Sequence, residues 1–274
     1  MNELDLVAEN ERLLREAAAL RERVQGFERS RWWRLHPRLL LRRSSPPVRA
    51  AAGRSPDTEE FYPFIRAGSA RSAAVVAPVV QDLVQARSML DVGGGEGWWA
   101  SAFSRLGVTS VSIDNGPLPR TAPGVTCVEH DLRRPIGREV GAPDLVLCLE
   151  VAEHLEPAIG DRLVGELCSL APVVLFSAAV PGQGGMSHVN EQWPAYWVER
   201  FESHGFRCSG ALRWRFWLDD RVESWYRQNV LFATSDPNRY PTLFDTPMAE
   251  PWPVVHPATL TRLHAPPAQW VASG

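Results

Sequence analysis

From about residue 57, short apolar runs alternate with longer runs in which apolar residues recur at helical spacing. Short continuous apolar runs are typical of buried strands, and longer periodic runs are typical of amphipathic helices. We predict strands at 88–92, 108–114, 126–129, 144–149 and 173–178, then an antiparallel pair at 207–216 and 224–233. We predict helices at 72–85, 98–106, 158–170 and 193–204. This alternation indicates an α/β fold with a seven-stranded, mostly parallel sheet and helices on both faces.

The first residues of the chain have a different pattern. Over residues 1–28, one series recurs every seven positions at Leu6, Leu13, Leu20 and Phe27, and a second at Asn10, Ala17 and Val24. An asparagine within such a series is typical of a two-stranded coiled coil. We therefore predict an N-terminal coiled-coil helix that assembles the protein into a homo-oligomer. A single amphipathic helix packed on the main domain is the alternative.

Residues 29–56 are interpreted as a basic linker, because residues 29–54 contain eight arginines and no acidic residue. Tryptophans and leucines among these arginines suit peripheral contact with an anionic membrane or a polyanionic partner. A solvated linker explains the same composition. The main domain then covers residues 57–235, and residues 236–274 form a proline-rich C-terminal tail with little periodicity.

Composition narrows the possible functions. The net charge of −3 over 274 residues does not favour nucleic-acid binding. All 29 basic residues are arginine, which excludes Schiff-base catalysis and the phosphate loop, since both require lysine. The four cysteines lack a C-x-x-C pair and are expected to be core thiols in a reducing compartment. The N-terminus does not resemble a signal peptide and no apolar run is long enough to cross a membrane, so we expect a cytoplasmic protein.

A glycine-rich loop follows the first predicted strand, in the segment Asp91-Val-Gly-Gly-Gly-Glu-Gly97. Glycines at this place let the main chain turn sharply and let a ligand lie against it. A dinucleotide fingerprint that starts at Gly93 needs glycine at position 98, where Trp98 stands, and no phosphate-loop lysine is present. S-adenosylmethionine is the third candidate. Asp114, at the end of the second strand, suits its ribose diol, and Asp131, after the third, suits its adenine amine.

The sequence resembles the class I S-adenosylmethionine-dependent methyltransferases over roughly residues 70–235. The matching segments are 90–97, 112–114, 130–132 and 144–155. This resemblance implies a Rossmann-like sheet whose last strand is antiparallel. It also implies roles for individual residues. By similarity, the amino-acid part of the cofactor is lined by Gly93, Gly95 and Gly97, and Asp91 supports their loop. The ribose would contact Asp114 and Asn115, and the adenine would lie between Asp131 and Leu132. Glu150 would lie beneath the methyl group.

The loop after the fifth strand carries the candidate acceptor site. It contains His188, Asn190, Gln192 and Trp193 within six residues. Carboxamides bind hydroxyls and aromatic faces stack on sugar rings, while a histidine can accept the proton of a hydroxyl. We predict that Asn190, Gln192 and Trp193 bind the acceptor and that His188 is the general base. Alternatively, His188 and Asn190 cap the following helix.

His154, after the fourth strand, is the second candidate base. The chain is similar here to quinone O-methyltransferases, in which a Glu-x-x-Glu-His arrangement has been linked to a divalent metal. The resemblance suggests a metal site at Glu150, Glu153 and His154. Hard cations, however, usually bind more oxygen ligands than these residues offer, so we predict no metal.

The sequence favours an O-methyltransferase that acts on a sugar hydroxyl of a nucleotide sugar, surface glycan or glycosylated natural product. The Asp/Asn-Pro-Pro-Tyr/Phe motif of amino methyltransferases is absent after the fourth strand, where residues 150–157 read Glu-Val-Ala-Glu-His-Leu-Glu-Pro. The arginine- and tryptophan-rich arm also looks like that of enzymes acting on bacterial surface glycans. Two alternatives are a methyltransferase of phenolic or other small metabolites and a non-catalytic scaffold that assembles through its coil.

Overall fold

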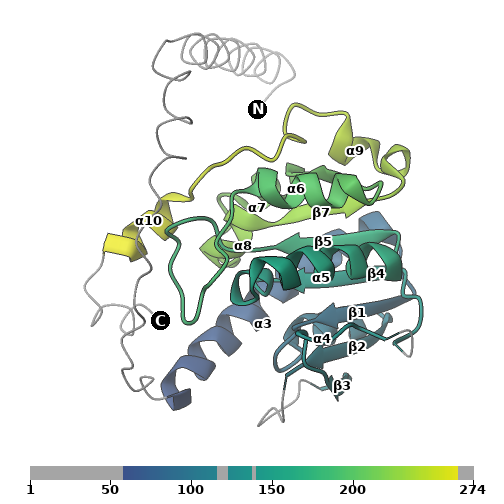
Figure 1. Cartoon of the computed structure of the whole chain (residues 1–274), viewed down its shortest axis with the longest axis horizontal. Coiled ribbons are helices and arrows are strands. Elements are labelled where there is room, and N and C mark those ends of the chain that lie inside the picture. The colour runs from purple at the N-terminus through teal and green to yellow at the C-terminus, as the bar shows by residue number, and fades with distance from the viewer. Residues whose placement is uncertain (1–57, 116–122, 138–139, 265–274) are drawn as a thin grey trace, which may run out of the picture. The chain divides into compact units, whose positions relative to one another are not determined.

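The computed structural model describes residues 58–115, 123–137 and 140–264 (Figure 1). The predicted coiled coil at 1–28 and the basic linker lie outside these residues. The described part contains a seven-stranded sheet with the order β3-β2-β1-β4-β5-β7-β6. The strands are β1 (Ser88–Val92), β2 (Thr109–Asp114), β3 (Thr126–Glu129), β4 (Leu145–Leu149), β5 (Val173–Ser177), β6 (Arg207–Ser209) and β7 (Leu231–Thr234).

The first five strands are parallel, and β7 is antiparallel to both of its neighbours, β5 and β6. The α/β fold and the antiparallel pair predicted from the sequence are therefore confirmed. The order reverses at β1, whose neighbours are β2 on one side and β4 on the other. Ligands of open α/β sheets bind at the carboxyl ends of the strands beside such a reversal.

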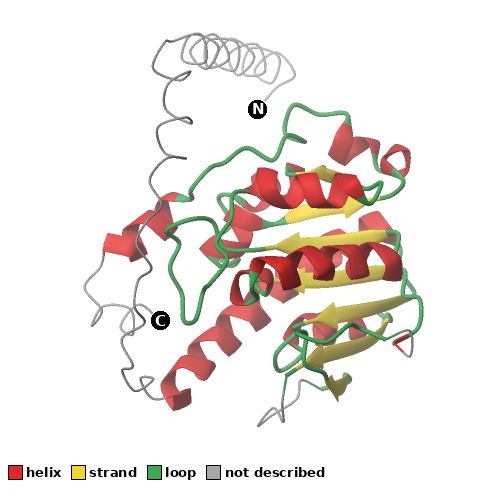
Figure 2. Cartoon of the chain, in the orientation of Figure 1, coloured by secondary structure: helices red, strands yellow, loops and turns green. Residues whose placement is uncertain are grey.

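Helices cover both faces of the sheet (Figures 1 and 2). One face packs against α3 (Thr58–Val84) and α4 (Trp98–Ser104), and the other against α5 (Pro157–Leu170) and α6 (Pro194–Ser203). Strand β4 shows why both layers are needed, because Leu145 and Leu147 belong to one apolar cluster and Val146 and Cys148 to the other. All five β4 residues are buried, as expected for a strand covered on both faces.

The last predicted pair of strands is shorter than expected. Residues 207–216 form β6 only as far as Ser209 and then the helix α7 (Ala211–Phe216), and residues 224–229 form α8 (Ser224–Asn229) before β7 begins. Leu212 and Phe216 are four residues apart and both pack in the core, which is helical rather than strand spacing. The prediction was wrong there because a short apolar run fits either period.

The segment after β7 contributes to the core. It contains η3 (Pro237–Arg239), α9 (Pro241–Phe244) and α10 (Pro257–His264). The rings of Tyr240 and Phe244 pack on Phe232 of β7, with centroid separations of 4.9 and 6.4 Å. Among the described helices, none is long and apolar enough to span a membrane.

Candidate functional site

The glycine-rich loop joins β1 to α4 at the carboxyl edge of the sheet. Gly93, Gly95 and Gly97 have φ values of +70°, +56° and +82°, a region in which side chains are strained. A Cβ atom on Gly93 would lie 2.5 Å from a methyl carbon of Val151, whereas a Cβ on Gly95 would meet nothing within 4 Å. At Gly93 the loop therefore packs closely against Val151, which follows β4, whereas the Cβ position of Gly95 faces space that no protein atom fills.

Asp114 fixes this loop from the end of β2. Its Oδ2 accepts a hydrogen bond from the Gly95 amide (2.8 Å), and its Oδ1 accepts one from the Asn115 amide (2.6 Å). Asp114 is partly buried and Asn115 is exposed. Each carboxylate oxygen has a second lone pair, so Asp114 keeps acceptor capacity for a ligand that lies against the loop.

Beneath the loop are two polar atoms with no hydrogen-bond partner in the described part of the chain, Asp91 Oδ2 and Ser112 Oγ. Asp91 is 1% exposed, and its burial raises the pKa of the carboxyl from the usual 3.8 to about 7. A Cβ on Gly94 would lie 2.4 Å from Asp91 Oδ2 and 2.3 Å from Ser112 Oγ, so glycine keeps the main chain close to both. A buried carboxylate with a free oxygen suits a cationic ligand group.

Asp131 and Leu132 follow β3. The Asp131 carboxylate accepts hydrogen bonds from Arg133 Nε (2.9 Å) and the Arg133 amide (3.0 Å), and this guanidinium lowers the pKa of Asp131. Leu132 is buried at 7% exposure. The structure thus joins Asp131 to Arg133, a pairing that was not predicted from the sequence, and Asp114 is the acid that contacts the glycine loop.

Glu150, directly after β4, is the centre of a carboxamide network. Its backbone has φ +56°, and its carboxylate accepts hydrogen bonds from Asn229 Nδ2 (3.0 Å) and Gln183 Nε2 (3.0 Å). Gln228 donates to Gln183 Oε1 (2.9 Å) and is itself fully buried. Burial raises the pKa of Glu150, and the hydrogen bonds from Asn229, Ser177 and Gln183 oppose that rise.

No role in the site was predicted from the sequence for Gln183, Gln228 or Asn229, although the segment that ends at Asn229 is similar to sugar-directed methyltransferases. The sequence does carry a signal for Gln228 and Asn229, because these two carboxamides immediately precede the apolar run at 230–233. Gln183 and Asn229 contact Glu150, and Gln228 contacts Gln183, only because α8 and the loop after β5 meet at one place, which no local pattern reveals.

Glu153 and His154 lie in η2 (Ala152–His154), one turn beyond Glu150. Glu153 is fully buried and its Oε1 accepts a hydrogen bond from the Ala179 amide (3.2 Å). Burial first, and the charge of Glu150 second, raise the pKa of Glu153 well above its usual value. His154 keeps contact with solvent, yet partial desolvation and the neighbouring His188 lower its pKa, which the charge of Asp114 opposes.

The long loop between β5 and α6 extends beyond the carboxyl ends of the parallel strands (Figure 1). It carries His188, whose ring lies edge-on to His154 with a centroid separation of 4.8 Å. His188 Nδ1 is 2.9 Å from Glu191 Oε1, and the Glu191 carboxylate also accepts hydrogen bonds from the amides of Gly182 (2.7 Å) and Gly184 (2.9 Å). Glu191 therefore shapes the loop and orients the His188 ring.

The three predicted acceptor-binding residues differ in their surroundings. Asn190 is 2% exposed, and its Oδ1 accepts a hydrogen bond from Gln192 Nε2 (3.0 Å), so Asn190 anchors the loop. Trp193 is 40% exposed and precedes α6, which begins at Pro194. No side chain caps α6 at Trp193, so the helix-capping alternative for His188 and Asn190 is not what the structure shows.

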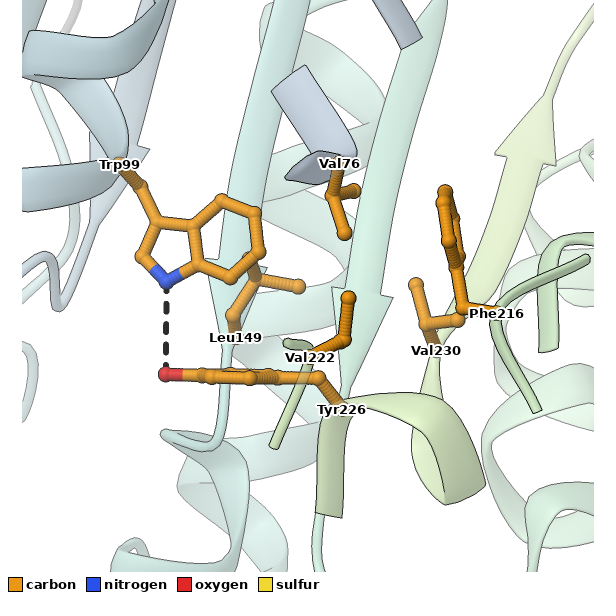
Figure 3. Close-up of a pocket in the computed structure, with 7 residues that line it drawn as sticks. All are labelled: Val76, Trp99, Leu149, Phe216, Val222, Tyr226 and Val230. Atoms are coloured by element: carbon orange, nitrogen blue, oxygen red, sulfur yellow. Dashed lines mark hydrogen bonds between the residues drawn. The ribbon is translucent and has the colours of Figure 1, made fainter. Parts of the chain in front are cut away.

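A small pocket lies among apolar side chains that include Leu149, the last residue of β4 (Figure 3). In it the Trp99 indole N–H donates to the Tyr226 hydroxyl (3.3 Å). None of the predicted site residues lines this pocket, and its wall is hydrocarbon apart from that one hydrogen bond. We therefore treat it as a packing gap in the core.

Part of the chain is similar in sequence to known proteins. Two curated proteins, each named "Uncharacterized methyltransferase", from Mycobacterium ulcerans (strain Agy99) and Mycobacterium marinum (strain ATCC BAA-535 / M), are 31% identical over 116 residues, which is 36% of this chain. The chain spans 42% of the length of each of these relatives. No family model matches the chain.

Similar folds occur among solved structures. CalS10, an amino pentose methyltransferase, is 17% identical with a TM-score of 0.48, over 68% of this chain and 99% of its own. DesVI from Streptomyces venezuelae is 15% identical with a TM-score of 0.48, over 66% of this chain and 98% of its own. CalO1, from calicheamicin biosynthesis, is 20% identical with a TM-score of 0.44, over 54% of this chain and 51% of its own.

The sheet order, the antiparallel β7 and the methyltransferase relatives agree with each other. The described residues have the α/β architecture with an antiparallel last strand that the resemblance to class I S-adenosylmethionine-dependent methyltransferases implied, and 36% of the chain matches proteins named as methyltransferases. The resemblance found in the sequence is confirmed at this level.

Proposed function

We propose that this protein is an S-adenosylmethionine-dependent O-methyltransferase that methylates a sugar hydroxyl of a nucleotide sugar, a surface glycan or a glycosylated natural product. The observation that carries the proposal is the histidine pair at the carboxyl edge of the sheet. His154 and His188 lie ring to ring, and His188 is oriented by Glu191. Proton removal by an oriented histidine is the chemistry that a hydroxyl acceptor requires.

The residues of the glycine-rich loop fit the proposed cofactor. Gly95 offers an open main-chain surface, and Asp114 holds this surface in place while keeping free lone pairs for a diol. Asp91 Oδ2 is buried without a partner in the described chain, which suits the positive charge of the cofactor's amino-acid end. When bound, S-adenosylmethionine would supply an electrophilic methyl group.

The chain's own task is then to position the acceptor and take its proton. With Nδ1 of His188 engaged by Glu191, Nε2 is the nitrogen that can accept a proton from the acceptor hydroxyl. The lowered pKa of His154 keeps this second ring neutral at pH 7, so it can hydrogen-bond to the acceptor without repelling a protonated His188. General-base catalysis typically contributes about 10²–10⁴-fold in rate, and positioning contributes the rest.

Sugar specificity is supported by the loop that ends at Trp193. This side chain is 40% exposed beside the histidine-bearing loop, and an exposed indole face is a common platform for a sugar ring. Because Asn190 is buried in loop contacts, Gln192 and Trp193 are the better candidates for direct contact with the acceptor.

The proposal is tested by substituting the base while monitoring the cofactor separately. His188→Ala is expected to lower turnover at least tenfold and to leave the Kd for S-adenosylhomocysteine unchanged, because His188 is not part of the glycine loop. Turnover is measured as transfer of labelled methyl to a panel of nucleotide sugars and simple phenols. Equal loss of S-adenosylhomocysteine binding would remove His188 from the base role.

The same panel separates the alternatives. Label found only on phenols would replace the sugar with a phenolic acceptor. Retained S-adenosylhomocysteine binding without transfer to any acceptor, including those in extracts of the source organism, would favour a scaffold. Three expectations stay predictions from the sequence. Assembly through residues 1–28 and peripheral membrane contact through residues 29–54 concern residues outside the described structure. The third is the cytoplasmic location.

A further inference from the structure

We propose that the main-chain N–H of His256, acting through Gln228, sets the direction of the carboxamide network that holds Glu150. His256 directly precedes α10, in the segment that follows β7. Its amide donates to Gln228 Oε1 (2.7 Å), and both residues are buried. Gln228 is then a positioning residue of the acceptor side, and part of the segment expected from the sequence to be a tail contributes to the site.

The His256 amide matters because a carboxamide has no preferred direction of its own. The oxygen and nitrogen of an Asn or Gln side chain occupy nearly equivalent positions, so the group turns over to suit its partners. A main-chain N–H, by contrast, can only donate. If Gln228 were turned over, its NH₂ group would face the His256 N–H, and a buried donor would lose its acceptor. This contact therefore fixes which end of Gln228 faces the network.

The direction passes from Gln228 to its two carboxamide neighbours. Gln228 Nε2 donates to Gln183 Oε1 (2.9 Å) and to Asn229 Oδ1 (2.9 Å). Because these oxygens are engaged, Gln183 Nε2 and Asn229 Nδ2 face the Glu150 carboxylate, each at 3.0 Å. The Val180 amide makes a longer contact with Gln183 Oε1 (3.4 Å), so a second main-chain donor favours the same direction.

The network consequently runs from a group that can only donate to a group that accepts when it is ionised. Its last hydrogen bonds present N–H groups to Glu150, and such donors favour a carboxylate over a carboxylic acid. The C-terminal segment thereby holds a fixed, negatively charged oxygen pair beside the acceptor loop, 106 residues away in sequence from His256 at Glu150. The use of this charge in methyl transfer rests on the proposed function, but the direction of the network does not.

The test treats the two ends of Gln228 separately, by NMR of the nitrogen-15-labelled full-length chain. Gln228→Met removes both ends at similar size, and the NH₂ groups of Gln183 and Asn229 should then exchange with water at least about tenfold faster, because their bonds to Glu150 open more often. Gln228→Glu keeps an oxygen for the His256 amide and can donate at most one hydrogen bond in place of two. It should give a smaller acceleration at the NH₂ groups, and the His256 amide should exchange faster only in Gln228→Met.

Thr259→Val is the matched control. It removes the hydroxyl that lies 3.2 Å from Ser224 Oγ, so it weakens another contact between the same segment and α8 without altering a carboxamide. Exchange at Gln183 and Asn229 should stay as in the wild type, and circular dichroism confirms that each variant is folded. The proposal is overturned if Gln228→Met leaves this exchange unchanged, or if Thr259→Val accelerates it as much as Gln228→Met does.

Methyl transfer by the same samples measures the effect on turnover. Gln228→Met should lower kcat/KM at least about tenfold, because it releases two carboxamides, and should leave the Kd for S-adenosylhomocysteine unchanged. Wild-type turnover in Gln228→Met would overturn the positioning role of Gln228. If the wild type transfers methyl to no acceptor, only the proposed function is contradicted, because the exchange measurement needs no acceptor.

Discussion

The two sides of the candidate site are built in different ways. On the cofactor side, consecutive residues of one loop present main-chain atoms, and Asp114 holds that loop through the Gly95 amide. On the acceptor side, the working groups are side chains from three distant segments: η2, the loop between β5 and α6, and α8. Glu150 joins them by accepting hydrogen bonds from Gln183 and Asn229, which are 33 and 79 residues away in sequence.

This difference explains what each side can tolerate. A main-chain surface depends on backbone conformation, so it is sensitive to an added side chain wherever the loop is tightly packed or has positive φ. A side-chain network depends on matched donors and acceptors, so it is sensitive to the loss of one polar group. Substitutions on the cofactor side should therefore lower stability and cofactor affinity, and substitutions on the acceptor side should mainly lower turnover.

The largest effect is expected for Gly93→Ala. The new Cβ would lie 2.5 Å from Val151 and would occupy a backbone with φ +70°. Left-handed strain and overpacking together should lower the free energy of unfolding by about 2–5 kcal/mol, with loss of S-adenosylhomocysteine binding. Urea unfolding and calorimetry measure both.

Gly107→Ala is the matched control for Gly93→Ala. Gly107 has φ +83°, but a Cβ there meets nothing within 4 Å, so only the conformational strain of about 1–2 kcal/mol should appear. Cofactor binding should survive in this variant. Equal effects at Gly93 and Gly107 would mean that the close contact with Val151 has no consequence.

A smaller and more specific effect is expected for Asp114→Asn. Loss of a charged acceptor is worth about 1.5–3 kcal/mol, which corresponds to a roughly 10- to 100-fold weaker affinity for S-adenosylhomocysteine. The fold should be retained, because the Asn side-chain oxygen can still accept the hydrogen bond of the Gly95 amide. Asp131→Asn is the comparison, since that carboxylate is already paired with Arg133. A larger loss at Asp131 than at Asp114 would exchange their proposed roles.

The cofactor side of the site was easier to predict from the sequence than the acceptor side, because it is built from one local loop and not from distant side chains. The glycine loop, Asp114 and the five parallel strands are local patterns, and the structure has them where they were expected. The pairing of Asp131 with Arg133 was missed although the two residues are neighbours, because the pattern does not say which way a carboxylate turns. His188 was predicted from its loop as the general base, but its contact with His154 could not be predicted, because that contact arises only when β4 and β5 lie side by side.

The smallest effect is expected for Gln183→Ala. This substitution tests the contrast between the two sides of the site, because it should change the acceptor side and leave cofactor affinity unchanged. Gln183 Nε2 donates to Glu150 Oε2, and its Oε1 accepts from Gln228 and Asn229. Removing it should lower kcat/KM by less than about tenfold and the free energy of unfolding by about 1 kcal/mol, with an unchanged Kd for S-adenosylhomocysteine.

The pH dependence of Gln183→Ala tests the reason for its effect. The folded-state pKa of Glu150 is raised by burial, and the Gln183 hydrogen bond is among the contacts that hold it down, so the substitution should raise this pKa further. A raised carboxyl pKa means that stability is lost as pH rises from the usual Glu value of 4.5 through the folded pKa. The destabilisation by Gln183→Ala should therefore be larger at pH 8 than at pH 4, because the fraction of ionised Glu150 rises with pH. Urea unfolding at the two pH values measures this, and a loss independent of pH would show that Gln183 acts through loop packing and not through the Glu150 charge.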